Sequence, residues 1–197
     1  MIAPETTIPR LLLGAAARHG ERPALEDGAV TLRYAELPEA ALRAARAFRA
    51  SGVRVGDRVA IWAPNLWEWV IAALGLQCAG AVLVPINTRM KGAEAGQILR
   101  KSRARLLCTV GEFLGNRYLD LLEGEDLPGL ETLVTFRGHD PRAIPWVDFL
   151  ARAASLSEDE ARRRAEEQPR DRRLRSDHRP APVAEAAPRP RLAARAP

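Results

Sequence analysis

Hydrophobic positions follow two different spacings along most of the chain. Between residues 34 and 51, apolar side chains recur every three or four positions, which is the period of a helix with one buried stripe. That stripe comprises Leu37, Ala41, Ala44, Ala45 and Phe48. Elsewhere, short runs such as 81–86 are apolar at every position, which predicts strands covered on both faces. Together the two patterns predict an α/β protein whose mostly parallel sheet carries helices on both faces.

The other elements follow from the same periods together with capping and turn residues. Expected helices are 9–19, 34–51, 66–79, 93–102, 113–122 and 146–154, and expected strands are 23–26, 30–33, 58–62, 81–86, 105–110 and 130–136. Thr7 and Asn65 are expected to be N-caps, and Gly80 is expected to end the helix before it. The order strand, helix, strand over 58–86 has the length of one right-handed βαβ unit, and the next helix and strand repeat it.

The composition of the chain changes near residue 168. With 47% hydrophobic residues the chain can bury a core, yet residues 158–197 contain 11 Arg, 9 Ala and 6 Pro and only three large apolar residues. We therefore expect one domain over 1–167, with 158–167 extending a helix, and a disordered basic tail over 168–197. The net charge of +5 resides in the tail, where 8 Arg face 3 acidic residues. The domain itself is neutral, so no nucleic-acid binding is expected.

An uncharged stretch over residues 69–88 is long enough to span a bilayer. It is interrupted by Gly75, Gln77 and Pro85, and it ends in a β-branched run, so a buried helix followed by a strand explains it better. The first residues lack the charged and apolar regions of a secretory signal. With two cysteines the chain cannot carry a disulfide scaffold. We expect no membrane span and a cytoplasmic location.

The residues alone contain no motif for nucleotide, metal or nucleophile chemistry. The Gly-rich phosphate and dinucleotide loops and the Gly-x-Ser-x-Gly turn are all missing from the sequence. His19, His139 and His178 are far apart and lack metal-ligand spacing. Cys78 and Cys108 fall in a buried helix and a core strand, which favours inert thiols over a nucleophile. We therefore assign no catalytic, cofactor-binding or metal residue.

Two clusters have both a functional and a packing interpretation. Trp62, Trp67 and Trp69 fall at one strand–helix junction, where packing is favoured over stacking on a ligand. An acidic cluster lies at the end of the 113–122 segment and comprises Asp120, Glu123, Glu125 and Asp126. It lacks the spacing of an oxygen-ligand site, so a solvated loop is favoured over a cation site.

One continuous stretch resembles a known family. Residues 52–69 read GVRVGDRVAIWAPNLWEW, and residues 79–89 read AGAVLVPINTR. This order resembles the opening region of the AMP-forming acyl-CoA synthetases, which belong to the adenylate-forming ligase superfamily. The segments TLRYAEL at 31–37 and LPGL at 127–130 support it, and the resemblance covers about residues 5–167.

The resemblance implies an ATP- and magnesium-dependent chemistry. Members of the family convert a carboxylic acid, often a fatty acid, to an acyl-adenylate and then to a coenzyme A thioester. They stabilise the charge on the α-phosphate with a T-S-G-T-T-G-x-P-K-G type loop that follows the region matched here. This sequence reads PRDRRLRSDHRPAP from 169 to 182 instead. The change near residue 168 motivates the hypothesis that out-of-frame coding replaces the rest of the enzyme.

Two functions are compatible with these observations. In the first, the chain is the amino-terminal fragment of an acyl-CoA ligase; it is truncated before the phosphate loop, inactive by itself, and prone to self-association through exposed apolar faces. In the second, it is a stand-alone binding or regulatory α/β module that uses the basic tail for electrostatic contacts. The resemblance transfers no catalytic residue, because the reacting groups of the family lie beyond the match.

Overall fold

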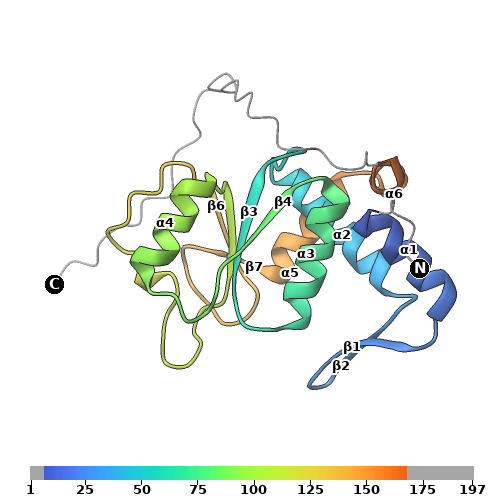
Figure 1. The fold of residues 1–197 in the computed structure, drawn as a ribbon, viewed down its shortest axis with the longest axis horizontal. Coiled ribbons are helices and arrows are strands. Elements are labelled where there is room, and N and C mark those ends of the chain that lie inside the picture. Colours follow the sequence, from blue (N-terminus) through green and yellow to red (C-terminus); the bar gives the residue numbers. More distant parts are fainter. Residues whose placement is uncertain (1–6, 168–197) are drawn as a thin grey trace.

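Short buried strands form a parallel sheet that lies between layers of helices (Figure 1). The structure is a computed structural model, and it describes residues 7–167 of the chain. Its helices are α1 (Ile8–His19), α2 (Leu37–Ala50), α3 (Trp67–Ala79), α4 (Gly92–Ser102), α5 (Trp146–Ala151) and α6 (Glu158–Glu167), with short 3-10 helices η1 (Asp120–Leu122) and η2 (Arg152–Ser155). Its strands are β1 (Pro23–Asp27), β2 (Val30–Arg33), β3 (Arg58–Trp62), β4 (Val82–Pro85), β5 (Leu106–Thr109), β6 (Thr132–Thr135) and β7 (Ile144–Pro145).

The main sheet has five parallel strands in the order β4-β3-β5-β6-β7. The chain runs from β3 to β4 on one side and then crosses to β5 on the other side of β3. Ala60 of β3 lies opposite both Val84 and Leu107, and all four residues of β5 are buried. Burial on both faces therefore explains the apolar sequence of β5. The prediction of the same burial for residues 81–86 is wrong, because β4 is an edge strand in which Val82, Leu83 and Val84 are half-buried and Pro85 is exposed. β1 and β2 form a separate antiparallel hairpin.

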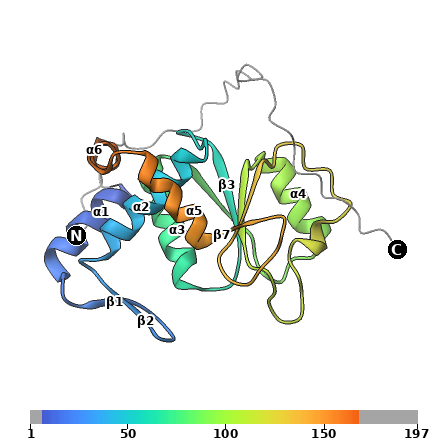
Figure 2. The ribbon, with the colours of Figure 1, turned by 180° about the vertical axis from the view of Figure 1, so that it is seen from behind.

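Helices cover both faces of the sheet unequally. Figures 1 and 2 show α4 on one face and α3 with α5 on the other, where α2, α1 and α6 add a further layer. The α2 stripe packs on α3, and Phe48 and Ala44 are fully buried. A Cβ on Gly75 would lie 2.6 Å from the Cβ of Ala44, so the two helices approach at a glycine.

The structure confirms the predicted α/β class and both βαβ units. The predicted span 158–167 is helix α6. Several boundaries differ from the prediction by one to three residues. For example, α2 begins at Leu37 rather than residue 34, α5 ends at Ala151 rather than residue 154, and the N-cap of α3 is Leu66 rather than Asn65. Thr7 is the N-cap residue of α1, but its hydroxyl makes no capping hydrogen bond.

The prediction of a helix over residues 113–122 is wrong. Phe113 and Asn116 instead exchange two backbone hydrogen bonds across a tight turn, in which Leu114 and Gly115 both have positive φ. Only η1 is helical in this segment. Gly115 adopts its positive φ without steric cost, and the side-chain amide of Asn116 donates to the carbonyl of Leu114 at 3.1 Å. The turn therefore prevails over the helical spacing of the apolar residues. The two-residue strand β7 was not predicted either, since it is too short to show a period.

The uncharged stretch over 69–88 forms most of α3 and then β4. Among residues 7–167, no helix is long and apolar enough to cross a membrane. The basic tail over 168–197 lies outside the described residues, so its separation from the domain remains a prediction.

Candidate functional site

Ligands of open parallel sheets bind beside the carboxyl ends of the strands, usually where successive connections leave on opposite sides. In this sheet that point lies between β3 and β5. It is filled by protein, since the hydroxyl of Thr109 donates to the carbonyl of Trp62 at 2.8 Å. Beside it, a Cβ on Gly111 would lie 3.1 Å from the backbone nitrogen of His139. The open cavity lies instead beside β3 and β4, on the other side of β3.

A cavity of about 510 Å³ lies at the carboxyl ends of β3 and β4. Its lining comprises Ala63, Pro64, Asn65, Trp69, Pro85, Ile86, Asn87 and Thr88. These residues supply one indole ring, two primary amides, one hydroxyl and an apolar surface, and none of them is charged. Such a lining can hold a ring or another neutral group by packing and hydrogen bonding. It offers no acid, base or nucleophile that would react with it.

Buried aromatic residues fix the loop that borders this cavity. The indole nitrogen of Trp62 donates to the carbonyl of Asn87 at 3.0 Å, and the hydroxyl of Tyr118 donates to the carbonyl of Thr88 at 3.1 Å. The Trp62 and Tyr118 rings meet edge to face at 4.6 Å. The amide oxygen of Asn87 also accepts from the backbone nitrogen of Arg89. The lining is therefore held in place before any ligand binds.

A second set of contacts ties the β1–β2 hairpin to the first turn of α3. Arg137 donates to both oxygens of the buried Glu68 at 2.8 and 2.9 Å, and it also pairs with Asp27 at the hairpin turn. Asp27 accepts the backbone N–H of Trp67 at 3.1 Å. That N–H and Arg137 lower the pKa of Asp27, and Glu68 with Asp27 raises the pKa of Arg137. Asp27 thus caps α3 from 40 residues away.

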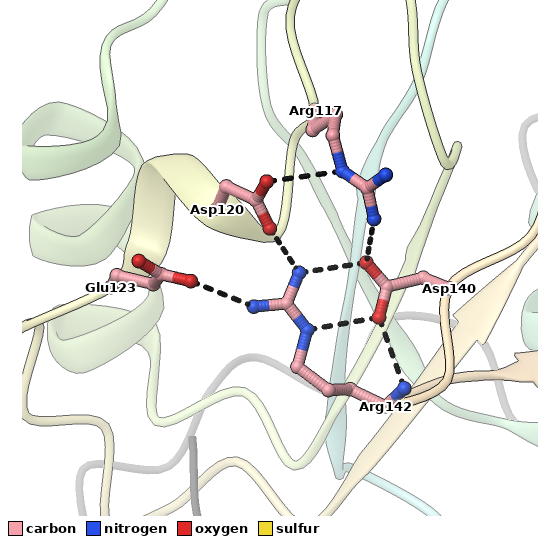
Figure 3. Close-up of polar contacts among 5 residues, drawn as sticks. All are labelled: Arg117, Asp120, Glu123, Asp140 and Arg142. Atoms are coloured by element: carbon pink, nitrogen blue, oxygen red, sulfur yellow. Dashed lines mark hydrogen bonds and ion pairs between the residues drawn. The ribbon is translucent and has the colours of Figure 1, made fainter. Parts of the chain in front are cut away.

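A five-residue network joins the segments that follow β5 and β6 (Figure 3). Arg142 donates to both carboxylate oxygens of Asp140, at 2.9 and 2.7 Å, and Arg117 lies 3.4 Å from the same group. Asp120 pairs with both arginines, and Glu123 lies 3.3 Å from Arg142. The Asp140 side chain is only 1% exposed, and Arg142 lowers its pKa to about 2. This carboxyl group is therefore a fixed anion and not a proton donor near neutral pH.

Cys78, Cys108 and His19 lie in α3, β5 and α1, and His139 lies in the loop after β6. Cys78 and Cys108 are buried. Burial raises the pKa of Cys78 to about 12 and also raises that of Cys108. His19 lies beside Tyr34 near the end of α1, and His178 is outside the described residues. Within residues 7–167, no three His, Cys, Asp or Glu side chains form a group that could hold a metal ion.

The tryptophan and acidic clusters are only partly as predicted. Trp62 is fully buried in packing, whereas Trp69 is half-buried and lines the cavity. The acidic side chains do not gather into one cluster: Asp120 and Glu123 pair with Arg142, and Glu125 pairs with Arg100. Sequence reasoning missed the roles of Arg137, Arg142, Asp140 and Asn87. The only signal for them was their position in the loops that follow β4 and β6.

One known family matches most of the chain. The family described as "AMP-binding enzyme" matches residues 13–190, and the chain therefore belongs to that family. The match runs past residue 167 and includes part of the basic segment. It bears out the resemblance found in residues 52–89 and places the cavity in the amino-terminal part of an AMP-binding fold.

Several ligases are similar to this chain. The 3-[(3aS,4S,7aS)-7a-methyl-1,5-dioxo-octahydro-1H-inden-4-yl]propanoyl:CoA ligase of Rhodococcus jostii (strain RHA1) is 41% identical over 166 residues, covering 81% of this chain and 32% of the relative. The crotonobetaine/carnitine–CoA ligase of Salmonella paratyphi A is 39% identical over 95 residues, covering 48% of this chain and 18% of the relative. The chain therefore spans less than a third of the length of these curated relatives.

Solved structures of the family share the fold. The N-terminal domain of FACL13 from Mycobacterium tuberculosis superposes with a TM-score of 0.64 at 28% identity, covering 79% of this chain and 38% of that one. The anthranilate CoA ligase AuaEII in complex with anthranoyl-AMP gives a TM-score of 0.67 at 25% identity, covering 80% and 29%.

Proposed function

We propose that this chain supplies the amino-terminal scaffold of an ATP-dependent acyl-CoA ligase. In that reaction a carboxylate attacks the α-phosphate of ATP, pyrophosphate leaves, and the acyl group passes from AMP to the thiol of coenzyme A. The match of residues 13–190 to AMP-binding enzymes carries this proposal, together with the 41% identity to a CoA ligase over 166 residues.

Adenylation requires groups that stabilise charge on the transferring phosphate. The cavity at the carboxyl ends of β3 and β4 has no charged lining residue. Three arginines at the same edge of the sheet, Arg117, Arg137 and Arg142, are each paired with two or more carboxylates. The exposed Arg89 follows Thr88 but does not line the cavity. The described part of the chain thus contributes an uncharged cavity lining and arginine–carboxylate pairs that fix the loops around it. We therefore propose that the chain by itself does not adenylate, and that the reacting groups come from sequence outside it.

The substrate of the complete ligase is proposed to be a carboxylic acid. The names of the similar ligases specify a propanoate on two fused rings, crotonobetaine or carnitine, and anthranilate. A carboxyl group is the shared chemistry. The 41% identity favours an acid with a ring system over a simple fatty acid, although the chain spans only 32% of that relative.

Pyrophosphate release tests the lack of adenylation. The purified 197-residue chain is mixed with ATP, magnesium and a panel of octanoate, anthranilate and a bicyclic propanoic acid. We expect release at the level of a reaction without protein, while a complete ligase of the family releases pyrophosphate from at least one acid. Acid-dependent release by the 197-residue chain would contradict the proposal.

Complementation tests the scaffold role. The chain is co-expressed with the Rhodococcus ligase lacking the region matched here, and CoA thioester formation is measured. We expect thioester only when both pieces are present. A matched control uses the chain with Asp140→Asn. This variant removes the carboxylate that pairs with Arg142 in Figure 3 and leaves the lining of the cavity unchanged. If both pieces are soluble and no thioester forms, the scaffold proposal fails.

The second candidate function is a stand-alone binding module. The preformed neutral cavity with the half-buried Trp69 favours it, because binding needs no reacting group. Soluble expression of residues 1–167 with a cooperative thermal transition would support this function. Aggregation of the same residues would favour the incomplete ligase, because its apolar faces are exposed when the rest of the enzyme is missing.

A further inference from the structure

Helix α4 has a bare face near its start. A Cβ on Gly92 would lie 1.6 Å from the carbonyl oxygen of Leu121, and a Cβ on Gly96 would lie 2.6 Å from a carboxylate oxygen of Glu125. The backbone at Leu121 therefore rests directly on the helix at Gly92, where only glycine allows this approach, and the side chain of Glu125 lies over Gly96. Because residues four apart share a helix face, the same face continues into the last turn of α4.

In the last turn the glycines give way to arginines, and a cavity opens. Arg100 and Arg103 occupy the continuing face and line this cavity together with residues 126–130. The space between them is about 460 Å³, and its lining comprises Leu99, Arg100, Arg103, Ala104, Asp126, Leu127, Pro128, Gly129 and Leu130. The floor is mainly apolar. The cavity lies at the amino ends of β5 and β6, on the edge of the sheet opposite the neutral cavity.

The charges around this cavity leave one guanidinium without a structural role. Arg100 pairs with Glu125 at 2.5 Å. The end of α4 is already satisfied by Arg58, which donates to the carbonyls of Ser102 at 2.7 Å and Arg103 at 3.2 Å. The exposed Arg103 side chain makes no hydrogen bond or ion pair within residues 7–167. Its backbone has φ of 53°, a left-handed conformation in which glycine is usual.

We propose that this cavity binds a small apolar carboxylate. The hydrocarbon body packs on Leu99, Leu127 and Leu130, and the carboxylate accepts hydrogen bonds from the guanidinium of Arg103. Asp126 lies on the same rim and makes no ion pair within the described chain. Its charge opposes an anionic ligand and so limits affinity. This site is independent of the proposed ligase function, because it lies away from the carboxyl ends of the strands.

Octanoate binding to the 197-residue chain tests the proposal by NMR of leucine methyl groups. We expect the methyl signals of Leu99, Leu127 and Leu130 to shift on titration. Octanol should bind more weakly than octanoate, and octylammonium should bind weakest of the three. This order follows from charge, because the hydrocarbon body is the same in all three probes.

Variants separate the guanidinium from general hydrophobic binding. Arg103→Gly removes the charge but suits the left-handed backbone, so the fold is retained and octanoate should bind about fivefold or more weakly. Asp126→Asn should tighten binding by about twofold, since it removes a repelling charge. Lys101 lies in the same turn but does not line the cavity. Lys101→Gln should therefore leave the affinity for octanoate unchanged. Equal affinity in Arg103→Gly, equal binding of octanol, or shifts confined to other leucines would each overturn the proposal.

Discussion

At the scale of single residues, arginine side chains fix the loops that follow the strands. Arg137 holds Glu68 and Asp27, and Arg142 holds Asp120 and Glu123 as well as Asp140, so each guanidinium joins segments that are separated in the sequence. The planar fork of arginine matches a carboxylate with two hydrogen bonds, which a lysine ammonium does not. These pairs keep the carboxyl edge of the sheet rigid without occupying the neutral cavity.

Replacing Asp140 by Asn should destabilise the protein in a pH-dependent manner. The pKa of Asp140 is lowered from 3.8 to about 2 in the fold, so its carboxylate stabilises the fold above pH 4. That contribution is lost as the pH falls from about 4 to about 2. Asp140→Asn should cost about 2 kcal/mol at pH 7, and the difference from the natural chain should shrink below pH 4. Urea unfolding at several pH values measures this difference; a pH-independent difference would contradict it.

The two thiols should be unreactive in the folded chain. Burial raises the pKa of both Cys78 and Cys108, so little thiolate exists at pH 8 and reagents have no access to it. Ellman's reagent should label neither residue on a timescale of minutes, and it should label both in urea. Rapid labelling of either native thiol would show that its surroundings open locally.

At the scale of elements, α2 and α3 cross at a glycine. A Cβ on Gly75 would lie 2.6 Å from Ala44 and 3.1 Å from the carbonyl oxygen of Ala41, so no side chain fits there. Gly75→Val should lower the free energy of unfolding by about 3 kcal/mol through overpacking. Gly14→Ala is the matched control in α1, because its Cβ would meet only the flexible end of Arg18 at 3.3 Å. Thermal unfolding should show a large loss for the first variant and none for the second.

The elements also show which parts of the fold the sequence could predict. The α2 stripe and the all-apolar strand β5 were identifiable because their spacing reflects burial within one segment. Segment 113–122 was misassigned because its apolar spacing is helical while Leu114 and Gly115 adopt a left-handed turn. Strand β7 depends on its partner β6 and has no pattern of its own.

At the scale of the whole molecule, the family was predictable from sequence order and the candidate site was not. Residues 52–89 carry the resemblance in their order along the chain. The lining residues of the cavity lie in the same segment, but they come together only because β3 and β4 pair in parallel, which the order does not show. The ion pair between Glu68 and Arg137 joins residues 69 positions apart, and no local period records such a contact. Composition showed that the domain is neutral, but it could not show that most of its arginines at the carboxyl edge are already paired.

The cap that Asp27 provides for α3 has a practical consequence for how the protein is handled. The first turn of α3 lacks a capping side chain of its own and instead depends on a hairpin formed 40 residues earlier. A shortened expression clone that starts after residue 30 would keep every residue of the neutral cavity. It would nevertheless remove the acceptor of the Trp67 N–H and one of the two carboxylates paired with Arg137, and the helix that presents Trp69 would fray from its start. The β1–β2 hairpin therefore supports the cavity through Asp27, although none of its residues lines the cavity.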